Sequence, residues 1–352
     1  MVEGPRVTEV RAAFAAIDPT GMYARPMRPL LPRVIRVWAL AATFMIACVG
    51  SAEGRVIGNG TAASCTSNAV VAAVRAGGVI RFSCGSKPVT IKIRRTAKVV
   101  NTSSMVVLDG GGKVTLDGGG KRRILYMNTC DPKQIFTTSH CQDQATPRLV
   151  VRGLRFFGGN STGQSFDGGG GGAIFVRGGR LRIVNSTFIG NRCERSGPDL
   201  GGGAVRALSQ SRGRPVEVIN STFRRNICSN GAALSSIGVS WRISGSRFIG
   251  NRAIGNGANP ARKGTPGGGS GGAIYNDGDR FELVIDNSTF INNQAREGGG
   301  AIFFVSNNRT GRLKIRRSTL RDNPSDGFET AGFPGIFFLG AGRPQVVGSV
   351  IR

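Results

Sequence analysis

Arginine and lysine side chains recur in the loops that follow a short motif, F-x-x-N, in the second half of the chain. Insertions at one turn of a repeating fold fall on one face, so these side chains are expected to gather on a single surface. Such a surface attracts polyanions, whether nucleic acid, anionic polysaccharide or lipid head groups. The predicted ligand-binding residues are Arg192, Arg195, Arg252, Arg262, Lys263 and Arg296.

The charge of the whole chain points the same way. The 352 residues contain 47 Lys and Arg against 20 Asp and Glu, a net charge of +27. Residues 1–52 hold six Arg and three acidic residues, so 41 basic and 17 acidic residues, a net of +24, belong to residues 53–352. Solubility is the alternative reading of this charge. Because neither aromatic platforms nor a nucleic-acid module accompanies the basic loops, we expect an anionic polysaccharide or cell-surface component and no nucleic acid.

A secretory signal peptide is predicted near the N-terminus. Arg28, Arg33 and Arg36 precede the apolar run 37–49, which ends in small residues and predicts a mature chain starting at Glu53. Residues 1–52 are therefore an N-terminal extension with a signal peptide, and Met22 and Met27 are alternative starts. The run is short for a membrane span, so no transmembrane segment is expected in the mature chain.

A second reading of the same segment leaves the protein anchored. The residues Met45-Ile-Ala-Cys48 loosely resemble a bacterial lipobox, which would make Cys48 a lipid-modified anchor. Both readings predict a secreted or cell-surface protein.

Internal repeats dominate residues 149–352 and decide the fold class. In each copy, buried apolar positions alternate with outward-facing positions up to a final apolar residue, which we call the anchor. This alternation is the pattern of a strand with one buried face. Asparagines three residues after most anchors are expected to stack and to hydrogen-bond one another. In the first copy Asn160 comes one residue late, which predicts a local bulge. The anchors are Phe156, Phe188, Phe223, Phe248, Phe290, Leu320 and Ile351.

Outward-facing positions lie six residues before the anchors. They predict an exposed ladder of alternating charge, to which we assign no function. Its members are Arg182, Glu217, Arg242, Val284 and Lys314.

A second motif, Gly-Gly-Ala followed by an apolar residue, lies between the anchor copies. Two strand types that keep their frame while the connections vary in length are typical of a parallel coil, in which each strand stacks on the rung below. Residues of about 66–76 read as a helix that Thr66 or Ser67 caps and Gly77 ends, suited to cover the open end of the coil.

Six cysteines remain after the signal region, an even number that suits an exported disulfide framework. Cys193 and Cys228 each lie five residues after an anchor, so they should stack on adjacent rungs and form a bridge. The predicted pairs are Cys65–Cys84, Cys130–Cys141 and Cys193–Cys228.

At these motifs the chain resembles the right-handed parallel β-helix, or pectin-lyase-like, superfamily, and its paired GGAI and F-x-x-N motifs resemble the repeat of polymorphic outer-membrane proteins. The resemblance covers roughly residues 53–352 as one domain. It implies an all-β, right-handed parallel β-helix (solenoid) with a short N-terminal capping helix. It also implies exported surface proteins, often adhesins, and more distantly polysaccharide lyases and hydrolases.

The resemblance also implies where catalysis would have to lie. Hydrolases of the superfamily need clustered aspartates and a histidine, but the only histidine here, His140, is in a loop beside a cysteine. Lyases of the superfamily use calcium, for which oxygen ligands on neighbouring rungs are candidates. Solvated turn residues are the interpretation we favour, and no other cofactor is expected. The candidate calcium ligands, each just ahead of a Gly-Gly-Ala segment, are Asp167, Asp199 and Glu297.

Two hypotheses therefore stand at this point. The first is a secreted or cell-surface, non-catalytic protein that binds anionic polysaccharide or acts as an adhesin, and the second is a polysaccharide lyase or glycoside hydrolase. Clustered carboxylates in a groove would favour the enzyme. The chain ends at Arg352 within an anchor motif, so we expect a partner or a further segment to cover the last rung.

Overall fold

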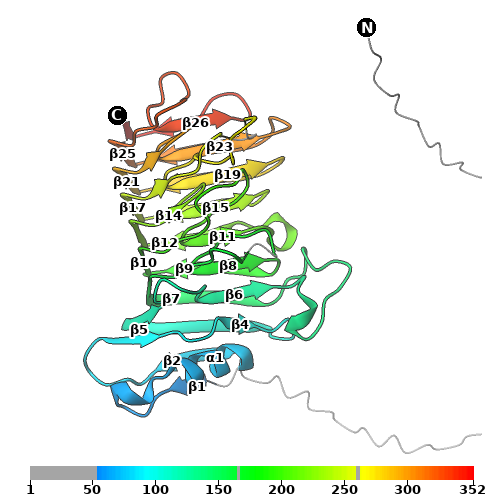
Figure 1. Ribbon diagram of the computed structural model, residues 1–352, viewed down its shortest axis with the longest axis vertical. Helices are drawn as coiled ribbons and strands as arrows, with labels where there is room; N and C mark the ends of the chain where they lie inside the picture. Colours follow the sequence, from blue (N-terminus) through cyan, green and yellow to red (C-terminus); the bar gives the residue numbers. More distant parts are fainter. Residues whose placement is uncertain (1–53, 165–166, 259–261) are drawn as a thin grey trace, which may run out of the picture. The chain divides into compact units, whose positions relative to one another are not determined.

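The computed structural model describes residues 54–164, 167–258 and 262–352, which form a parallel β-helix of stacked rungs (Figure 1). All strand pairs between its named strands are parallel and belong to three sheets of 17, eight and three strands. The predicted signal peptide, Glu53 and Cys48 lie outside the described residues. No helix in the described ranges is long and apolar enough to span a bilayer.

The 17-stranded sheet carries the anchor motif. Its strands are β1 (Gly54–Ile57), β2 (Gly78–Phe82), β3 (Val89–Lys92), β5 (Met105–Asp117), β7 (Arg148–Phe157), β9 (Arg180–Val184), β10 (Thr187–Ile189), β12 (Val216–Ile219), β13 (Thr222–Arg224), β16 (Trp241–Ser244), β17 (Arg247–Ile249), β20 (Glu282–Asp286), β21 (Thr289–Ile291), β24 (Arg312–Arg316), β25 (Thr319–Arg321), β27 (Gln345–Val347) and β28 (Val350–Ile351).

The eight-stranded sheet carries the Gly-Gly-Ala motif. Its strands are β4 (Ala97–Val99), β6 (Leu125–Asn128), β8 (Ile174–Arg177), β11 (Val205–Ala207), β15 (Leu234–Ile237), β19 (Ile274–Gly278), β23 (Ile302–Ser306) and β26 (Ile336–Leu339). The small third sheet, which follows the F-x-x-N turn, contains β14 (Ile227–Cys228), β18 (Arg252–Ala253) and β22 (Gln294–Ala295).

The strand register agrees with the repeat. Each predicted anchor pairs with the next, from Phe156 to Ile351. The anchor phenylalanines are fully buried, and their rings stack with centroids 4.4 to 4.9 Å apart. Each ring therefore packs against the rings above and below it, which removes a continuous apolar column from water.

The predicted asparagine ladder is present along the buried turn. The side-chain Nδ2 of each of the first four asparagines donates to Oδ1 of the asparagine on the next rung at 2.8 to 2.9 Å. The Nδ2 of every member also donates to the carbonyl of an anchor residue. These side chains are buried, so the ladder satisfies polar groups that water cannot reach. Its members are Asn191, Asn226, Asn251, Asn293 and Asn323.

The predicted bulge before Asn160 is wrong. The strand stays in register as far as Asn160, which pairs with Arg192 and so lies one position beyond the ladder. Gly159 takes the ladder position, and its backbone N–H donates to Oδ1 of Asn191 at 2.8 Å. A side chain is absent there because a Cβ on Gly159 would lie 2.3 Å from the carbonyl oxygen of Gly172.

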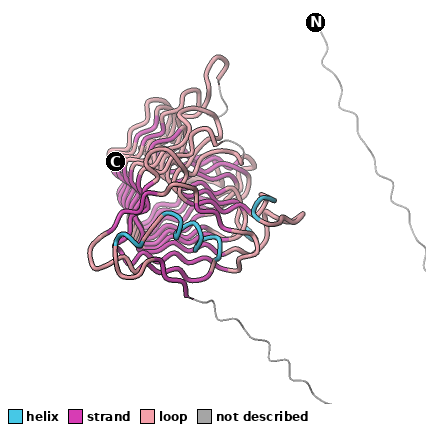
Figure 2. The backbone as a smooth tube through the Cα atoms, turned by 60° about the horizontal axis from the view of Figure 1, so that its bottom comes forward, coloured by secondary structure: helices cyan, strands magenta, loops and turns pink. Residues whose placement is uncertain are grey.

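The predicted capping helix is α1 (Ser67–Ala76), which lies across one end of the stack beside β1 and β2 (Figure 2). The hydroxyl of Thr66 accepts the N–H of Ala69 at 3.2 Å, and Gly77, with φ of 74°, ends the helix. Val70 and Val74 are fully buried in the core, so α1 covers the apolar interior of the first rungs. The described residues also contain three 3₁₀ turns, at Ala62–Ser64 (η1), Pro132–Gln134 (η2) and Ser211–Gly213 (η3).

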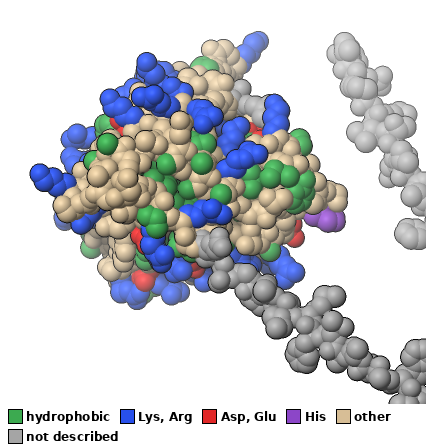
Figure 3. All heavy atoms as spheres, turned by 90° about the horizontal axis from the view of Figure 1, so that it is seen from below, with side chains coloured by type: hydrophobic (Ala, Val, Ile, Leu, Met, Phe, Trp, Pro, Cys, Tyr) green, Lys and Arg blue, Asp and Glu red, His purple; other side chains and the backbone are tan. Residues whose placement is uncertain are grey.

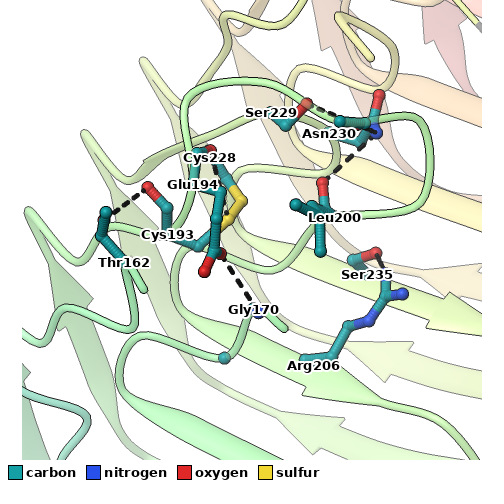
Figure 4. The surroundings of a disulfide bond; sticks show 12 residues. Thr162, Gly170, Cys193, Glu194, Leu200, Arg206, Cys228, Ser229, Asn230 and Ser235 are labelled. Carbon is teal, nitrogen blue, oxygen red and sulfur yellow. Dashed lines mark hydrogen bonds between the residues drawn. A yellow bond between two sulfur atoms is a disulfide. The ribbon is translucent and has the colours of Figure 1, made fainter. Parts of the chain in front are cut away.

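All three predicted disulfides are present, with Cα–Cα distances of 5.7 Å for Cys65–Cys84, 5.0 Å for Cys130–Cys141 and 4.8 Å for Cys193–Cys228. The third bridge ties adjacent rungs where the loop after the asparagine turn leaves the stack (Figure 4). Cys228 lies in β14, so the bridge fixes the start of the loop after Cys193 to the small third sheet.

Replacing both Cys193 and Cys228 with Ser is expected to lower the free energy of unfolding by about 2–4 kcal/mol, because the bridge closes a 35-residue separation in the unfolded chain. Denaturant unfolding of the variant measures the loss. The matched control replaces Cys130 and Cys141, whose separation is 11 residues, and should lose less. An equal or larger loss in the control would contradict the loop-length argument.

Candidate anion-binding site

The loops after the F-x-x-N turn bring only part of the predicted basic set together. Arg252 and Arg296 line a small hollow of about 130 Å³ that also contains Asp326. Arg192 lies in the same register column as Arg252, two rungs away through Ile227, or about 10 Å. Three of the six predicted residues therefore lie on one side of the stack, with a carboxylate among them.

Arg262, by contrast, forms an ion pair with Glu297. Its guanidinium donates to both carboxylate oxygens of Glu297, at 3.1 and 2.8 Å. Glu297 is 5% exposed and also accepts the N–H of Gly257 at 2.9 Å. Because removing the guanidinium would leave a buried carboxylate unpaired, Arg262 is a structural residue. Arg195 and Lys263 are exposed in their loops and line no hollow with Arg252.

The three candidate calcium ligands lie apart and have other partners. Glu297 is paired with Arg262, and Asp167 accepts the hydroxyl of Tyr126 at 2.5 Å and the amide of Asn128 at 2.9 Å. The side chain of Asp199 is exposed. No group of three or more metal-ligating side chains occurs among the described residues, so calcium binding stays a prediction without an assembled site.

Arg206, on the outward face of β11, is a buried cation that fixes a loop. It is 1% exposed and donates to the hydroxyl of Ser235 (Figure 4). It also donates to the backbone carbonyl of Asp199. Burial lowers the pKa of Arg206 to about 10, so it stays protonated at neutral pH. Its hydrogen bonds tie the loop that contains Asp199 to the eight-stranded sheet, and a ligand in solution cannot reach it.

A basic site that the sequence analysis did not predict lies on the outward face of the 17-stranded sheet. A hollow of about 390 Å³ crosses β7, β9, β12 and β16, and we call it the arginine groove. Leu149, Val150, Leu181, Pro215 and Glu217 form the rest of its lining. Its arginines are Arg148, Arg180, Arg182, Arg214 and Arg242.

Strand alternation and register place these arginines. Leu149 and Leu181 point into the core, so the residues before them, Arg148 and Arg180, lie on the outward side, and they pair across the rungs. Arg182 and Arg242 belong to the outward charge ladder, whose predicted register is confirmed. Positively charged side chains are prominent on the surface viewed from the α1 end as well (Figure 3).

The groove holds an excess of positive charge. Its one carboxylate, Glu217, is 3.0 Å from Arg182. None of Arg148, Arg180 and Arg214 forms an ion pair with a described residue, and within the described ranges the Nε atom of Arg180 is enclosed without a hydrogen-bond partner. A bound anion would relieve the repulsion among these three groups.

The titration of Arg180 reflects this crowding. Desolvation lowers the pKa of Arg180 from its ordinary value, and repulsion from Arg214 and Arg148 lowers it further. Arg212 acts in the same direction. The pKa shift points to a cluster of like charges around Arg180.

The groove lacks free carboxylates for acid–base catalysis. A neighbouring hollow of about 250 Å³ shares Glu217 and Arg242 and adds Asp286, whose Oδ2 is 2.5 Å from Arg317. Both carboxylates are therefore engaged with arginines. This arrangement can bind carboxylate or sulfate groups through paired N–H donors, and it offers no unpaired acid beside them.

Residues 287–305 match the Chlamydia polymorphic membrane protein repeat. The matched segment contains the anchor Phe290, the ladder residue Asn293 and the Gly299–Ile302 strand start, so it covers both motifs of one rung. The strands β21 and β23 of this repeat pair in register with those of the rungs on both sides. No curated protein and no solved structure is significantly similar to the chain.

The sequence contains a signal for the arginine groove that the repeat frame alone does not reveal. Arginine stands eight residues before the anchors Phe156 and Phe188, at the first position of the outward face. Arg214, nine residues before Phe223, joins them from the position directly after the 3₁₀ turn η3, which precedes β12. These arginines lie eight or nine residues before an anchor, whereas the charge ladder lies six residues before it. The charge ladder therefore did not include them, and Arg214 lies in a loop that no repeat frame describes.

Proposed function

We propose that this protein is an exported, cell-surface binding protein that holds an anionic polysaccharide in the arginine groove without cleaving it. The observation that supports it is the convergence of Arg148, Arg180 and Arg214 on one open hollow with no described carboxylate paired to them. Guanidinium groups bind carboxylate and sulfate through two parallel hydrogen bonds, and several on a rigid sheet present them without much loss of side-chain freedom.

The location at a cell surface has two supports. The matched repeat is named for a membrane protein, and three disulfides suit an oxidising compartment outside the cytoplasm. The signal peptide ending before Glu53, or the lipid anchor at Cys48, would provide the export route. An adhesin that grips acidic surface glycans is one form that this binding would take.

The alternative, a polysaccharide lyase or hydrolase, is less well supported by the groove. Such an enzyme needs a general base or nucleophile, usually an unpaired carboxylate, together with a group that acts as the acid. Glu217 and Asp286 are both in ion pairs, and His140 lies exposed in a different loop.

The test is a panel of immobilised polysaccharides, some sulfated, some rich in uronic acids and some neutral. The mature protein should be retained on acidic members and eluted by salt, because exposed charges are screened beyond about 8 Å at physiological ionic strength. Incubation with or without calcium should release no unsaturated sugars and no new reducing ends. Retention on no acidic member, or the release of either product, would overturn the proposal.

A further inference from the structure

A second basic hollow lies beside the arginine groove, at the corner where the chain enters the strands of the 17-stranded sheet. Its volume is about 710 Å³, and we call it the corner hollow. It is lined by Arg212, Arg280 and Arg312 together with polar residues and the acid Glu282. Glu282 is 2.5 Å from Lys314, and none of the three arginines is ion-paired to a described residue. The corner hollow is thus also positively charged.

The strand register puts the two hollows in line. Arg148 pairs with Arg180 at one end of the column, and Glu282 pairs with Arg312 at the other. Pro215 and Ser240 occupy the two rungs between these ends, because the residues that follow them, Val216 and Trp241, pair with each other. The N–H of Glu282 donates to Oγ of Ser240 at 3.0 Å, which links Ser240 to the next rung. The column therefore runs over six consecutive rungs, and five steps at the usual strand spacing make about 24 Å.

One turn joins the two hollows. Arg214 lines the arginine groove and Arg212 lines the corner hollow, and both lie in or directly after the 3₁₀ turn η3. Arg212 is also close enough to Arg180 to influence its titration. Positive charge therefore continues from one hollow to the next without an unpaired carboxylate among their lining residues.

We infer that the arginine groove and the corner hollow form one track along the axis of the solenoid, and that its ligand is a linear polysaccharide whose acidic groups recur along the chain. This inference rests on the proposed function and specifies its ligand. A small anion would fill one hollow and leave the other empty. An extended chain engages both, and linked contacts raise affinity without any new type of interaction.

Single-stranded nucleic acid would fit the charge but not the lining. Proteins that bind it without sequence preference stack bases on aromatic side chains, and the one aromatic residue lining either hollow, Phe281, is 4% exposed. The track therefore favours a sugar chain, which needs no stacking platform here, over a chain of bases.

The experiment uses oligosaccharides of defined length cut from a polysaccharide that the panel retains, titrated calorimetrically into the mature protein. Affinity should rise at least tenfold as the chain grows to about 24 Å and then level off. The Arg280→Ala/Arg312→Ala variant should bind long chains no better than short ones and bind short chains as the wild type does. The charge-matched control, Arg224→Ala/Arg247→Ala on exposed positions of β13 and β17, should behave as the wild type.

Three results would overturn the inference. If long chains bind the Arg280/Arg312 variant as tightly as the wild type, the track is wrong while the proposed function stands. If single-stranded DNA of matched length and charge binds the wild type as tightly as the sugar chain, the ligand class is wrong. If no acidic chain of any length binds the wild type, the proposed function fails as well. Circular dichroism and thermal melting of each variant verify that the fold is intact.

Discussion

Asn226→Ala should lower the free energy of unfolding by about 3–5 kcal/mol, since a buried polar group left without a partner costs about 1–3 kcal/mol. Asn226 is fully buried and is the second of the five members of the asparagine ladder, with a neighbour on both sides. Its amide donates to the carbonyl of Phe188 at 3.2 Å and to Asn251 at 2.9 Å, while its Oδ1 accepts the backbone and side-chain N–H groups of Asn191. The substitution leaves several of these groups unsatisfied at once.

Chemical denaturation monitored by circular dichroism measures this loss. The matched control is Asn68→Ala, because Asn68 is exposed on α1 and its Oδ1 accepts only a 3.3 Å hydrogen bond from Arg95. That substitution should change the stability by less than about 0.5 kcal/mol. Equal effects of the two substitutions would show that the ladder adds nothing beyond ordinary surface hydrogen bonds.

The repeat was predictable from the sequence because stacking imposes one frame on every rung. A strand that slipped by one residue would turn its anchor outward, so spacing within each copy is fixed while connections vary. For example, Phe248 pairs in register with both Phe223 and Phe290, although the connection to Phe290 is longer than the connection from Phe223. The same argument located Cys193 and Cys228 correctly.

Three strands of the eight-stranded sheet, β4, β6 and β26, were not predicted, and β4 pairs only with β6. β6 begins at Leu125 and β26 at Ile336, and both pair in register with the Gly-Gly-Ala strands. Neither begins with the full motif, because Leu125 follows Arg-Ile and Ile336 follows Pro-Gly. These strands share only their buried apolar residues with the repeat. A short apolar run in a sequence can be either a strand or part of a buried helix, so it did not identify them.

The candidate site was harder to predict because it depends on which charges pair. Arg262 and Glu297 are 35 residues apart and meet through two loops of unequal length, which no repeat frame describes. Arg214 follows a 3₁₀ turn directly, so its position in the groove also depends on loop conformation. Sequence patterns located the outward face correctly and could not separate paired from unpaired arginines on it.

Removing the arginines of the groove should have the largest effect on binding. In Arg148→Ala/Arg180→Ala/Arg214→Ala, three charged donors that face no described carboxylate are lost together. Hydrogen bonds to charged groups contribute about 1.5–3 kcal/mol each, and about 1.4 kcal/mol corresponds to a factor of ten. We therefore expect affinity for the acidic polysaccharide to fall by a factor of at least about 100. Melting should be little changed, because the lost side chains are on the outward face.

The most direct test compares this variant with a second one of equal charge, Arg252→Ala/Arg262→Ala/Lys263→Ala, in the loops after the F-x-x-N turn. The measurement is the dissociation constant of one acidic polysaccharide, at one salt concentration, for the wild type and both variants. The structure predicts that the groove variant loses binding and that the loop variant retains it to within about threefold, after allowance for any unfolding caused by loss of the Arg262–Glu297 pair. Binding that is lost in the folded loop variant and kept in the groove variant would contradict the assignment of the site to the arginine groove.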